Sequence, residues 1–264
     1  MRKLDDPEKA EWLLSFDFDG TLHHPADFPP VPHEFFQVIE RLRAERGAVW
    51  VINTGRSLGH FIEGLVGAAF PFLPDFAVVR ESEIFTPNEF GRWVSVEPWN
   101  RDCTKIHKSF FRKARRPLAR FRKKIEAETG AEWMNHDIEP AAIIARSEEE
   151  MEWICTQLDE LHQALPDLGW QRNSIYLRFG HRDFHKGSAL AEIARRLAIP
   201  PERTFAIGDG HNDLQMLDPR IARALACPAN AIQEVKDHVA SHNGHIASLP
   251  HGPGTVEALE TLLG

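Results

Sequence analysis

Two aspartates separated by one residue form the most chemically informative feature of the chain. Asp17 and Asp19 follow the apolar run 12–16 and precede Gly20-Thr21. The run predicts a buried strand, and Gly20-Thr21 predicts the turn that ends it. Residues i and i+2 of a strand share a face, so both carboxylates are expected at the edge where open α/β sheets bind ligands. Such a pair suits a hard, oxygen-liganded cation such as Mg²⁺ and offers a nucleophile and a separate proton donor. A turn with two solvated aspartates is the alternative.

Three later groups favour the chemical interpretation. Thr54-Gly55 follows a second apolar strand, and a hydroxyl with backbone N–H groups at a strand end can bind phosphate oxygens. Lys186 precedes a predicted helix, whose N-terminal dipole also favours an anion, although a solvated lysine is the simpler interpretation of this residue alone. Asp209 and Asp213 follow a third buried strand with glycines between strand and loop, which again suits a magnesium site.

The order of these four groups carries a resemblance. It runs Asp-x-Asp-Gly-Thr, Thr-Gly-Arg, Lys-Gly and Gly-Asp-x-x-Asn-Asp. This order resembles the haloacid dehalogenase-like phosphatase superfamily, and the long insert between the second and third groups is similar to the type IIB cap of Cof-type sugar phosphatases.

The resemblance implies a role for each matching residue. Asp17 would be the nucleophile that forms an aspartyl phosphate, and Asp19 would protonate the leaving oxygen and then deprotonate the attacking water. Thr54 and the Gly55 N–H would hold phosphate oxygens, and Lys186 would neutralise the phosphate and the nucleophile.

The same resemblance implies a metal site. Mg²⁺ would be held by Asp17, the backbone carbonyl of Asp19 and Asp209, with Asp213 as a direct or more distant ligand. Asn212 would contact the phosphate or order the metal's waters.

A narrower resemblance concerns the sucrose-phosphate phosphatases. Thr54-Gly55-Arg56-Ser57-Leu58, Pro98-Trp99 and His107-Lys108-Ser109-Phe110 are similar to segments of that family. Two segments differ. The family usually has Gly-Thr-Glu-Ile where this chain has Glu81-Ser82-Glu83-Ile84, and Asp-Asn-Thr where this chain has Asp19-Gly20-Thr21.

The resemblance therefore implies a Mg²⁺-dependent phosphomonoester hydrolase of a small phosphorylated sugar or sugar-like metabolite. Sucrose phosphate is one candidate substrate. A phosphosugar mutase or phosphotransferase is the first alternative. A non-catalytic phosphosugar-binding protein is the second, and the presence of both Asp17 and Asp19 argues against it.

Composition excludes several classes of partner. The chain has 264 residues and a formal net charge of −8, so bulk attraction to nucleic acid is not expected. No segment is long and apolar enough to span a membrane, and the polar N-terminal residues 1–8 lack the apolar core of a signal peptide. The isolated Cys103, Cys155 and Cys227 fit a reducing compartment. We expect a cytoplasmic protein with a small-molecule partner.

One segment departs from the acidic balance. From Arg101 to Lys124 the chain carries many lysines and arginines and one acidic residue, Asp102. A basic surface that steers a phosphorylated substrate, a patch for a polyanion and a solvated helix face are the three interpretations.

The elements that must position these residues alternate between strand and helix. The pattern predicts an α/β fold, a doubly wound parallel sheet, from residues 1–82 and 182–264, with strands at 12–18, 48–53, 76–79, 204–207 and 221–226 and helices that include 187–197 and 212–217. Between them, short strands and helices at 104–128 and 147–164 predict an inserted α+β cap over 83–181. Arg178 and His181, beside the return to the core, are the candidate cap residues for the substrate.

Overall fold

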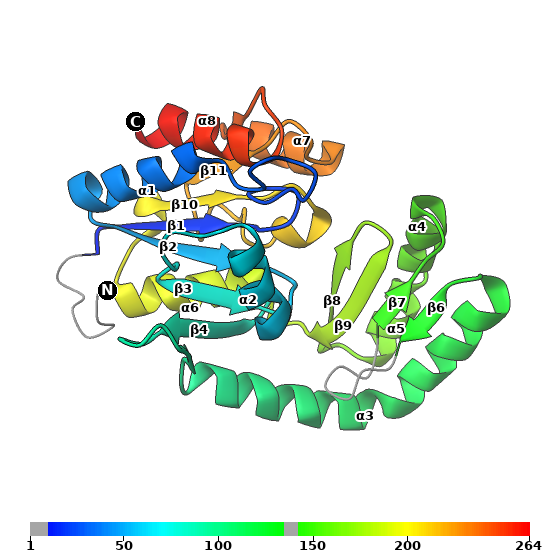
Figure 1. Ribbon diagram of the computed structural model, residues 1–264. Helices are drawn as coiled ribbons and strands as arrows, with labels where there is room; N and C mark the ends of the chain where they lie inside the picture. Colours follow the sequence, from blue (N-terminus) through cyan, green and yellow to red (C-terminus); the bar gives the residue numbers. More distant parts are fainter. Residues whose placement is uncertain (1–9, 135–141) are drawn as a thin grey trace. The chain divides into compact units, whose positions relative to one another are not determined.

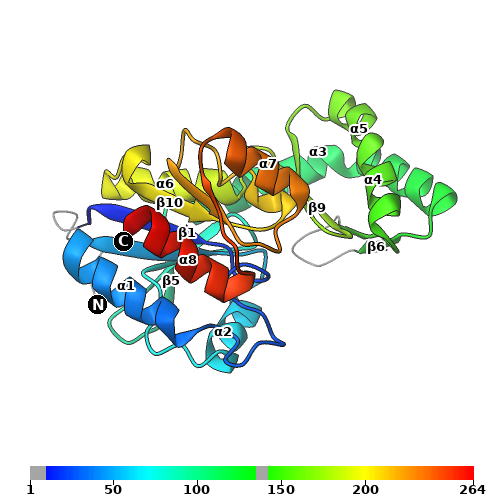
Figure 2. The same ribbon diagram turned by 90° about the horizontal axis from the view of Figure 1, so that it is seen from above.

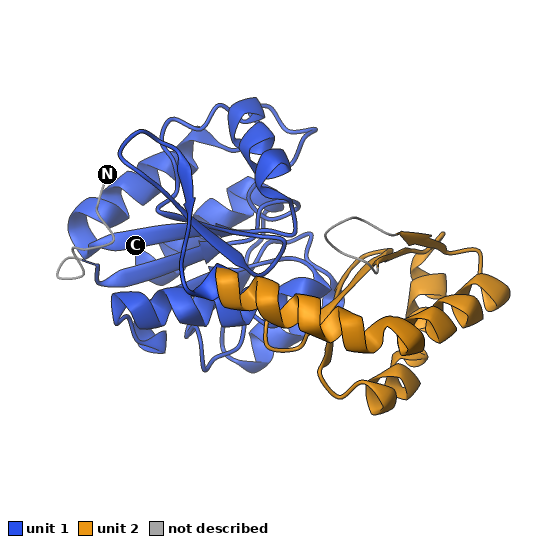
Figure 3. Ribbon diagram, turned by 90° about the horizontal axis from the view of Figure 1, so that it is seen from below, with its two compact units in different colours: residues 1–100, 186–264 blue, residues 101–185 orange. Residues whose placement is uncertain are grey.

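The computed structural model describes residues 10–134 and 142–264, so the polar N-terminal segment 1–8 lies outside the described residues. The chain forms two compact units. Residues 1–100 and 186–264 form the first unit, and residues 101–185 form the second (Figure 3). Among the described residues, no helix is long and apolar enough to cross a membrane.

The first unit is built on an eight-stranded sheet. The strand order is β12-β11-β10-β1-β2-β3-β4-β5. Neighbours from β12 to β3 are parallel, whereas β4 and β5 are antiparallel additions at one edge. In chain order the strands are β1 (Trp12–Phe16), β2 (Ala48–Asn53), β3 (Phe76–Val79), β4 (Glu83–Pro87), β5 (Trp93–Ser95), β10 (Thr204–Ile207), β11 (Ala224–Cys227) and β12 (His245–Ile246).

Helices cover both faces of this sheet, as a doubly wound fold requires (Figure 1). They are α1 (His33–Arg46), α2 (Leu58–Gly67), α6 (Lys186–Leu197), α7 (Gln233–Ser241) and α8 (His251–Leu263). Helices α1 and α8 lie side by side (Figure 2), and an ion pair of 2.7 Å joins Arg41 to Glu260. Helix α1 ends at Arg46, and the following Gly47 has a left-handed φ of 59° that lets its N–H donate to the Leu42 carbonyl.

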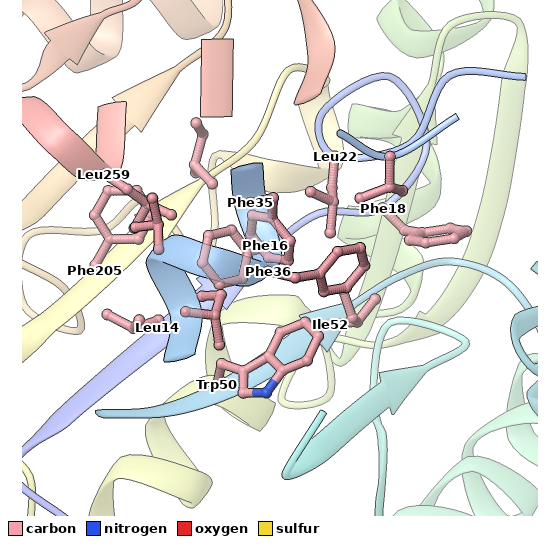
Figure 4. Packing of buried hydrophobic residues seen from close by; sticks show 14 of the residues in the cluster. Leu14, Phe16, Phe18, Leu22, Phe35, Phe36, Trp50, Ile52, Phe205 and Leu259 are labelled. Carbon is pink, nitrogen blue, oxygen red and sulfur yellow. The ribbon is translucent and has the colours of Figure 1, made fainter. Parts of the chain in front are cut away.

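The alternation of strand residues explains the two layers. Phe16 of β1 and Trp50 of β2 point toward α1 and α8, and both belong to the fully buried aromatic cluster of Figure 4. Leu13 and Val51, one residue out of phase, belong to the cluster that packs against α6 and α7. Both faces are therefore apolar, so the strands read as continuous hydrophobic runs. The predicted α/β core is confirmed.

The second unit has its own sheet and core. Its four strands are antiparallel in the order β6-β7-β9-β8. Its elements are α3 (Trp99–Glu128, whose first two residues belong to the first unit), β6 (Glu132–Met134), β7 (Ala142–Ile144), α4 (Glu148–Thr156), α5 (Leu158–Ala164), β8 (Leu168–Asn173) and β9 (Tyr176–His181). Ile143, Leu177 and Phe179 pack with side chains of α3, α4 and α5 in one hydrophobic cluster.

Several local expectations differ from the structure. The strand at 83–87, expected in the insert, pairs with β3, and the strand at 93–95 pairs with β4, so both extend the core sheet. The second compact unit spans residues 101–185, whereas the cap was expected over 83–181. The predicted helix 212–217 is wrong, because the chain forms only a 3₁₀ turn, His211–Asp213. The predicted helix 147–164 is two helices, α4 and α5.

Candidate active site

A buried lysine joins two of the motifs. Lys186, the first residue of α6, is fully buried, and its Nζ donates to Oδ1 of Asp17 at 2.6 Å and to Oδ1 of Asp213 at 2.7 Å. Asp17 directly follows β1, and its N–H donates to the Ile207 carbonyl of β10. The amide of Asn53, at the end of β2, donates to the Lys186 carbonyl at 3.0 Å. Three parallel strands therefore fix the lysine and the carboxylate that it contacts.

The Asp-x-Asp-Gly-Thr motif also contacts Asp209, which follows β10 and belongs to the Gly-Asp-x-x-Asn-Asp motif. The Thr21 hydroxyl donates to its Oδ1 at 2.5 Å. Gly20 has a φ of 82°, and a Cβ there would lie 2.6 Å from Asp209 Oδ2, so both the backbone angle and the space require glycine. Asp213 Oδ2 accepts the N–H groups of Asp209 and Gly210 at 2.9 Å each. These bonds hold the acidic loop in its tight turn.

Crowding raises the pKa values of the aspartates. Burial raises the pKa of Asp17 well above its usual value, and the nearby Asp213 carboxylate raises it further against the opposing effect of Lys186. Burial, followed by repulsion from Asp213, raises the pKa of Asp209 to about 6. For Lys186, burial opposes the charge, but the surrounding carboxylates outweigh it and raise the pKa.

This donor set fits a divalent cation. One ligand oxygen from each of Asp17, Asp209 and Asp213 can be chosen so that all lie within 4.8 Å of one another. Three carboxylates then share one ammonium, so the cluster carries excess negative charge that a bound cation would neutralise. Carboxylate oxygen is a ligand that hard cations such as Mg²⁺ prefer. Asp19 lies outside this cluster of side chains.

Asp19 is held by different partners. Nε and Nη2 of Arg56 donate to its two carboxylate oxygens at 2.7 and 2.5 Å, and His23 Nδ1 lies 3.5 Å away. Burial would raise the pKa of Asp19, but these contacts with His23 and Arg56 outweigh it and lower the pKa. The guanidinium lies over the Phe18 ring at 4.8 Å, and Gly64 of α2 leaves room for it, because a Cβ there would come within 2.5 Å of Nη1.

Glu81 connects the Thr-Gly-Arg motif with the Gly-Asp-x-x-Asn-Asp motif. Thr54 is buried, and its carbonyl accepts the Glu81 N–H at 3.0 Å. Oε1 of Glu81 accepts the amide of the buried Asn212 at 2.9 Å and would lie 3.3 Å from a Cβ at Gly55. Thr54, Gly55 and Asn212 are therefore gathered around one carboxylate, within the unit that holds Asp17 and Lys186.

The two candidate cap residues differ in their surroundings. Arg178 lies between Leu177 and Phe179 of β9, which face the hydrophobic cluster, so Arg178 lies on the opposite face of the four-stranded sheet. His181 packs its ring against Phe110 and Phe184 at centroid distances of 5.8 and 6.0 Å. Arg178 is thus half-buried on the face without that cluster, whereas His181 packs among aromatic rings of its own unit.

A model of the haloacid dehalogenase-like hydrolase family matches residues 76–245, more than half of the chain. The chain belongs to this family. The family that the four ordered motifs predicted is therefore confirmed, and the protein is an enzyme of the hydrolase class. The match begins after Asp17, Asp19 and Thr54, whose positions in the site come from the structure itself. The comparison with curated proteins found no match.

Solved structures share the fold of this hydrolase. The sucrose-phosphatase of Synechocystis sp. PCC6803, solved with sucrose and phosphate, has a TM-score of 0.71 at 18% identity, covering 96% of this chain and 98% of that one. A subclass IIB sugar phosphatase has a TM-score of 0.62 at 18% identity, with 95% and 98% covered. YhjK of Bacillus subtilis has 0.63 at 16%, with 99% and 98% covered. At such identities the likeness establishes a shared fold.

Sequence reasoning assigned no role to three residues that the hydrolase brings into its site. Arg56 belongs to the Thr-Gly-Arg motif, so its position was a signal even though its contact with Asp19 was not predicted. Asn53 ends β2 and holds the Lys186 backbone. Glu81 was visible only as a departure from the sucrose-phosphate phosphatase pattern.

Proposed function

We propose that this hydrolase is a Mg²⁺-dependent phosphatase that removes the phosphoryl group from a small phosphorylated sugar or sugar-like metabolite. The observation that carries the proposal is the buried contact between Lys186 and Asp17 beside Asp209 and Asp213. A phosphoryl group brings negative charge, and its transfer needs positive charge close to an aligned nucleophile.

In this proposal Asp17 attacks phosphorus and becomes an aspartyl phosphate, while the bond to the leaving oxygen breaks. Lys186 keeps the Asp17 carboxylate in place and offers its charge to the phosphoryl oxygens. The Thr54 hydroxyl and the Gly55 N–H hold other phosphoryl oxygens. Asn212 contacts the phosphate or orders the waters of the metal. Mg²⁺, held by Asp17, Asp209 and Asp213, would neutralise the charge that accumulates on the phosphoryl group.

Asp19 moves protons in both halves of the reaction. It gives a proton to the leaving oxygen and later takes one from the water that hydrolyses the aspartyl phosphate. The Arg56 contact favours the ionised carboxylate, which suits the second role. In the first role Asp19 carries a proton, so its bidentate contact with Arg56 must loosen before the leaving group departs.

We propose that the inserted unit, residues 101–185, acts as the cap that contacts the rest of the substrate. Its separate core supports this role, because an independently packed unit can move as one body. Arg178 is the candidate contact with the leaving group, because a guanidinium can donate hydrogen bonds to the oxygens of a sugar. His181 is the second candidate, through a ring nitrogen.

The test is release of inorganic phosphate with Mg²⁺ from p-nitrophenyl phosphate and from a panel of sugar monophosphates that includes sucrose 6-phosphate. We expect turnover of p-nitrophenyl phosphate and a preference of kcat/KM for sugar phosphates. Parallel assays with a sugar bisphosphate separate hydrolysis from phosphoryl transfer back to sugar. Absence of phosphate release from every ester, in a folded protein with Mg²⁺ present, would contradict the proposal.

A further inference from the structure

Glu81 occupies a backbone position that favours glycine. Arg80 and Glu81 have φ values of 48° and 65°, in the left-handed region where side chains other than glycine are strained. Both residues lie in the turn between β3 and β4, next to the second motif. A strained residue at a catalytic site calls for an explanation in the contacts of its side chain.

The side chain is buried among the residues assigned to phosphate. Glu81 is 5% exposed, and its Oε1 accepts the Asn212 amide. The same oxygen lies against Gly55, and the Glu81 N–H bonds to the Thr54 carbonyl. Its Oε2 has no hydrogen-bond partner among the residues that the structure describes. A buried carboxylate oxygen without a partner is unfavourable unless it serves a function.

The Glu81 carboxylate carries a charge of the same sign as the phosphate of the substrate. The carboxylate is near enough to Lys186 to act with Asp17 and Asp213 in stabilising the ammonium. A phosphate held by Lys186, Thr54 and Gly55 would therefore lie close to a fixed negative charge. At the effective dielectric of a protein site, like charges a few ångströms apart repel appreciably, whereas a cation at the same site is attracted.

We propose that Glu81 limits the affinity of the site for phosphate and so favours release of the inorganic phosphate product. This inference rests on the proposed phosphatase function and adds a residue that tunes it. Glu81 takes no part in bond making. Its carboxylate opposes the dianion and supports the cation, so its two effects on ligand binding have opposite signs.

The experiment compares wild type with Glu81→Gln and Glu81→Gly by calorimetric titration. Inorganic phosphate is titrated at saturating Mg²⁺, and Mg²⁺ is titrated alone. Glutamine keeps an acceptor for Asn212 and removes the charge, and glycine also relieves the backbone strain, which guards against misfolding. For Glu81→Gln we expect the Kd of phosphate to fall by about tenfold and the Kd of Mg²⁺ to rise. Product inhibition by phosphate should strengthen in parallel.

Glu83→Gln is the matched control, because Glu83 lies two residues away on β4 with its carboxylate 3.9 Å from Arg80. It should leave the phosphate Kd within about twofold, since a more exposed and paired charge is screened. Weaker binding of both phosphate and Mg²⁺ in Glu81→Gln would assign the residue a purely structural role and overturn the inference. The inference would also be overturned if wild type and Glu81→Gln both hydrolyse esters and bind phosphate with the same Kd. A wild type that neither hydrolyses esters nor binds phosphate would instead refute the phosphatase function.

Discussion

The two units of the molecule use charge in opposite ways. In the first unit Lys186 is fully buried, Asp213 is 1% exposed, and the two are joined in one network with Asp17. Among the described residues of the second unit no charged side chain is fully buried, and the pair of Lys124 with Glu160, whose side chain is 80% exposed, lies at the surface. Buried charges need specific partners, whereas surface pairs contribute little. In the function that we propose, the first unit would carry the chemistry and the second unit would contact the rest of the substrate.

The largest effect is expected at the centre of the buried network. Asp17→Asn should abolish hydrolysis, because the amide is a poor nucleophile and one candidate metal ligand is lost. The near-equal size of the two side chains should leave the fold intact. Steady-state turnover with circular dichroism as a folding control checks this expectation, and activity within about tenfold of wild type would exclude the covalent mechanism.

Asp19→Ala should lower kcat by about 10²–10⁴-fold through loss of proton transfer. The loss should be greatest for alkyl phosphates, whose leaving groups need a proton, and smallest for p-nitrophenyl phosphate. A series of esters with graded leaving-group pKa values gives the measurement. Equal losses across the series would show that Asp19 does not act as the acid.

Asp209→Asn tests the electrostatics of the cluster through stability. The folded-state pKa of Asp209 is raised to about 6, so its ionisation opposes folding and the metal-free protein should lose stability as pH rises from about 4 to about 6. The asparagine should therefore stabilise the metal-free protein at pH 8, on the order of 3 kcal/mol at most, and should gain less from added Mg²⁺. Urea unfolding with EDTA or with Mg²⁺ measures both effects, and a variant less stable than wild type without metal would contradict the assignment.

In the second unit, Arg178→Ala should raise KM for the preferred sugar phosphate by about tenfold, because a charged hydrogen bond to substrate is lost. Turnover of p-nitrophenyl phosphate should hardly change. Arg172→Ala is the matched control, since Arg172 lies on the neighbouring strand β8 and already pairs with Glu148 at 2.9 Å. Similar KM changes in both variants would remove Arg178 as a substrate contact.

The smallest effect is expected on the basic face of α3. Replacement of the exposed Lys113, Arg116 and Arg120 by glutamine should lower kcat/KM by less than about threefold, through slower encounter with an anionic substrate. The difference should disappear at high salt, where exposed charges are screened. A larger loss that persists at high salt would place this face in direct contact with substrate and would weaken the contrast between the two units.

Sequence patterns predicted the features that depend on local order. The apolar runs gave β1, β2, β3 and β10, and the parallel arrangement implied that the residues after them would meet. The sequence did not predict which of several distant segments a strand or side chain contacts. Strand β4 pairs with the free edge of β3, and no local pattern distinguishes that edge from a sheet of the insert. The predicted helix after Asn212 failed because the Asp213 carboxylate binds two backbone N–H groups and holds a tight turn.

The site shows the same division. The types of Asp17, Thr54, Lys186 and Asp209 predicted the chemistry that we propose for them, because each follows a strand or begins a helix at a ligand-binding edge. Glu81 could not be assigned in this way. Its role depends on burial and on a neighbour 131 positions away in sequence, Asn212, and both become visible only in three dimensions.

The bond from Asn53 to the Lys186 carbonyl has a mechanical consequence. Residue 186 is the first residue after the inserted unit, so in the cap role that we propose a motion of that unit would pull on the backbone next to the Lys186 ammonium. The side-chain amide of Asn53, at the end of strand β2, donates to the Lys186 carbonyl and so fixes the backbone at residue 186 to the core sheet. We expect this bond to keep the Lys186 backbone in place, and with it the alignment of Lys186 with Asp17, when tension reaches residue 186 along the chain.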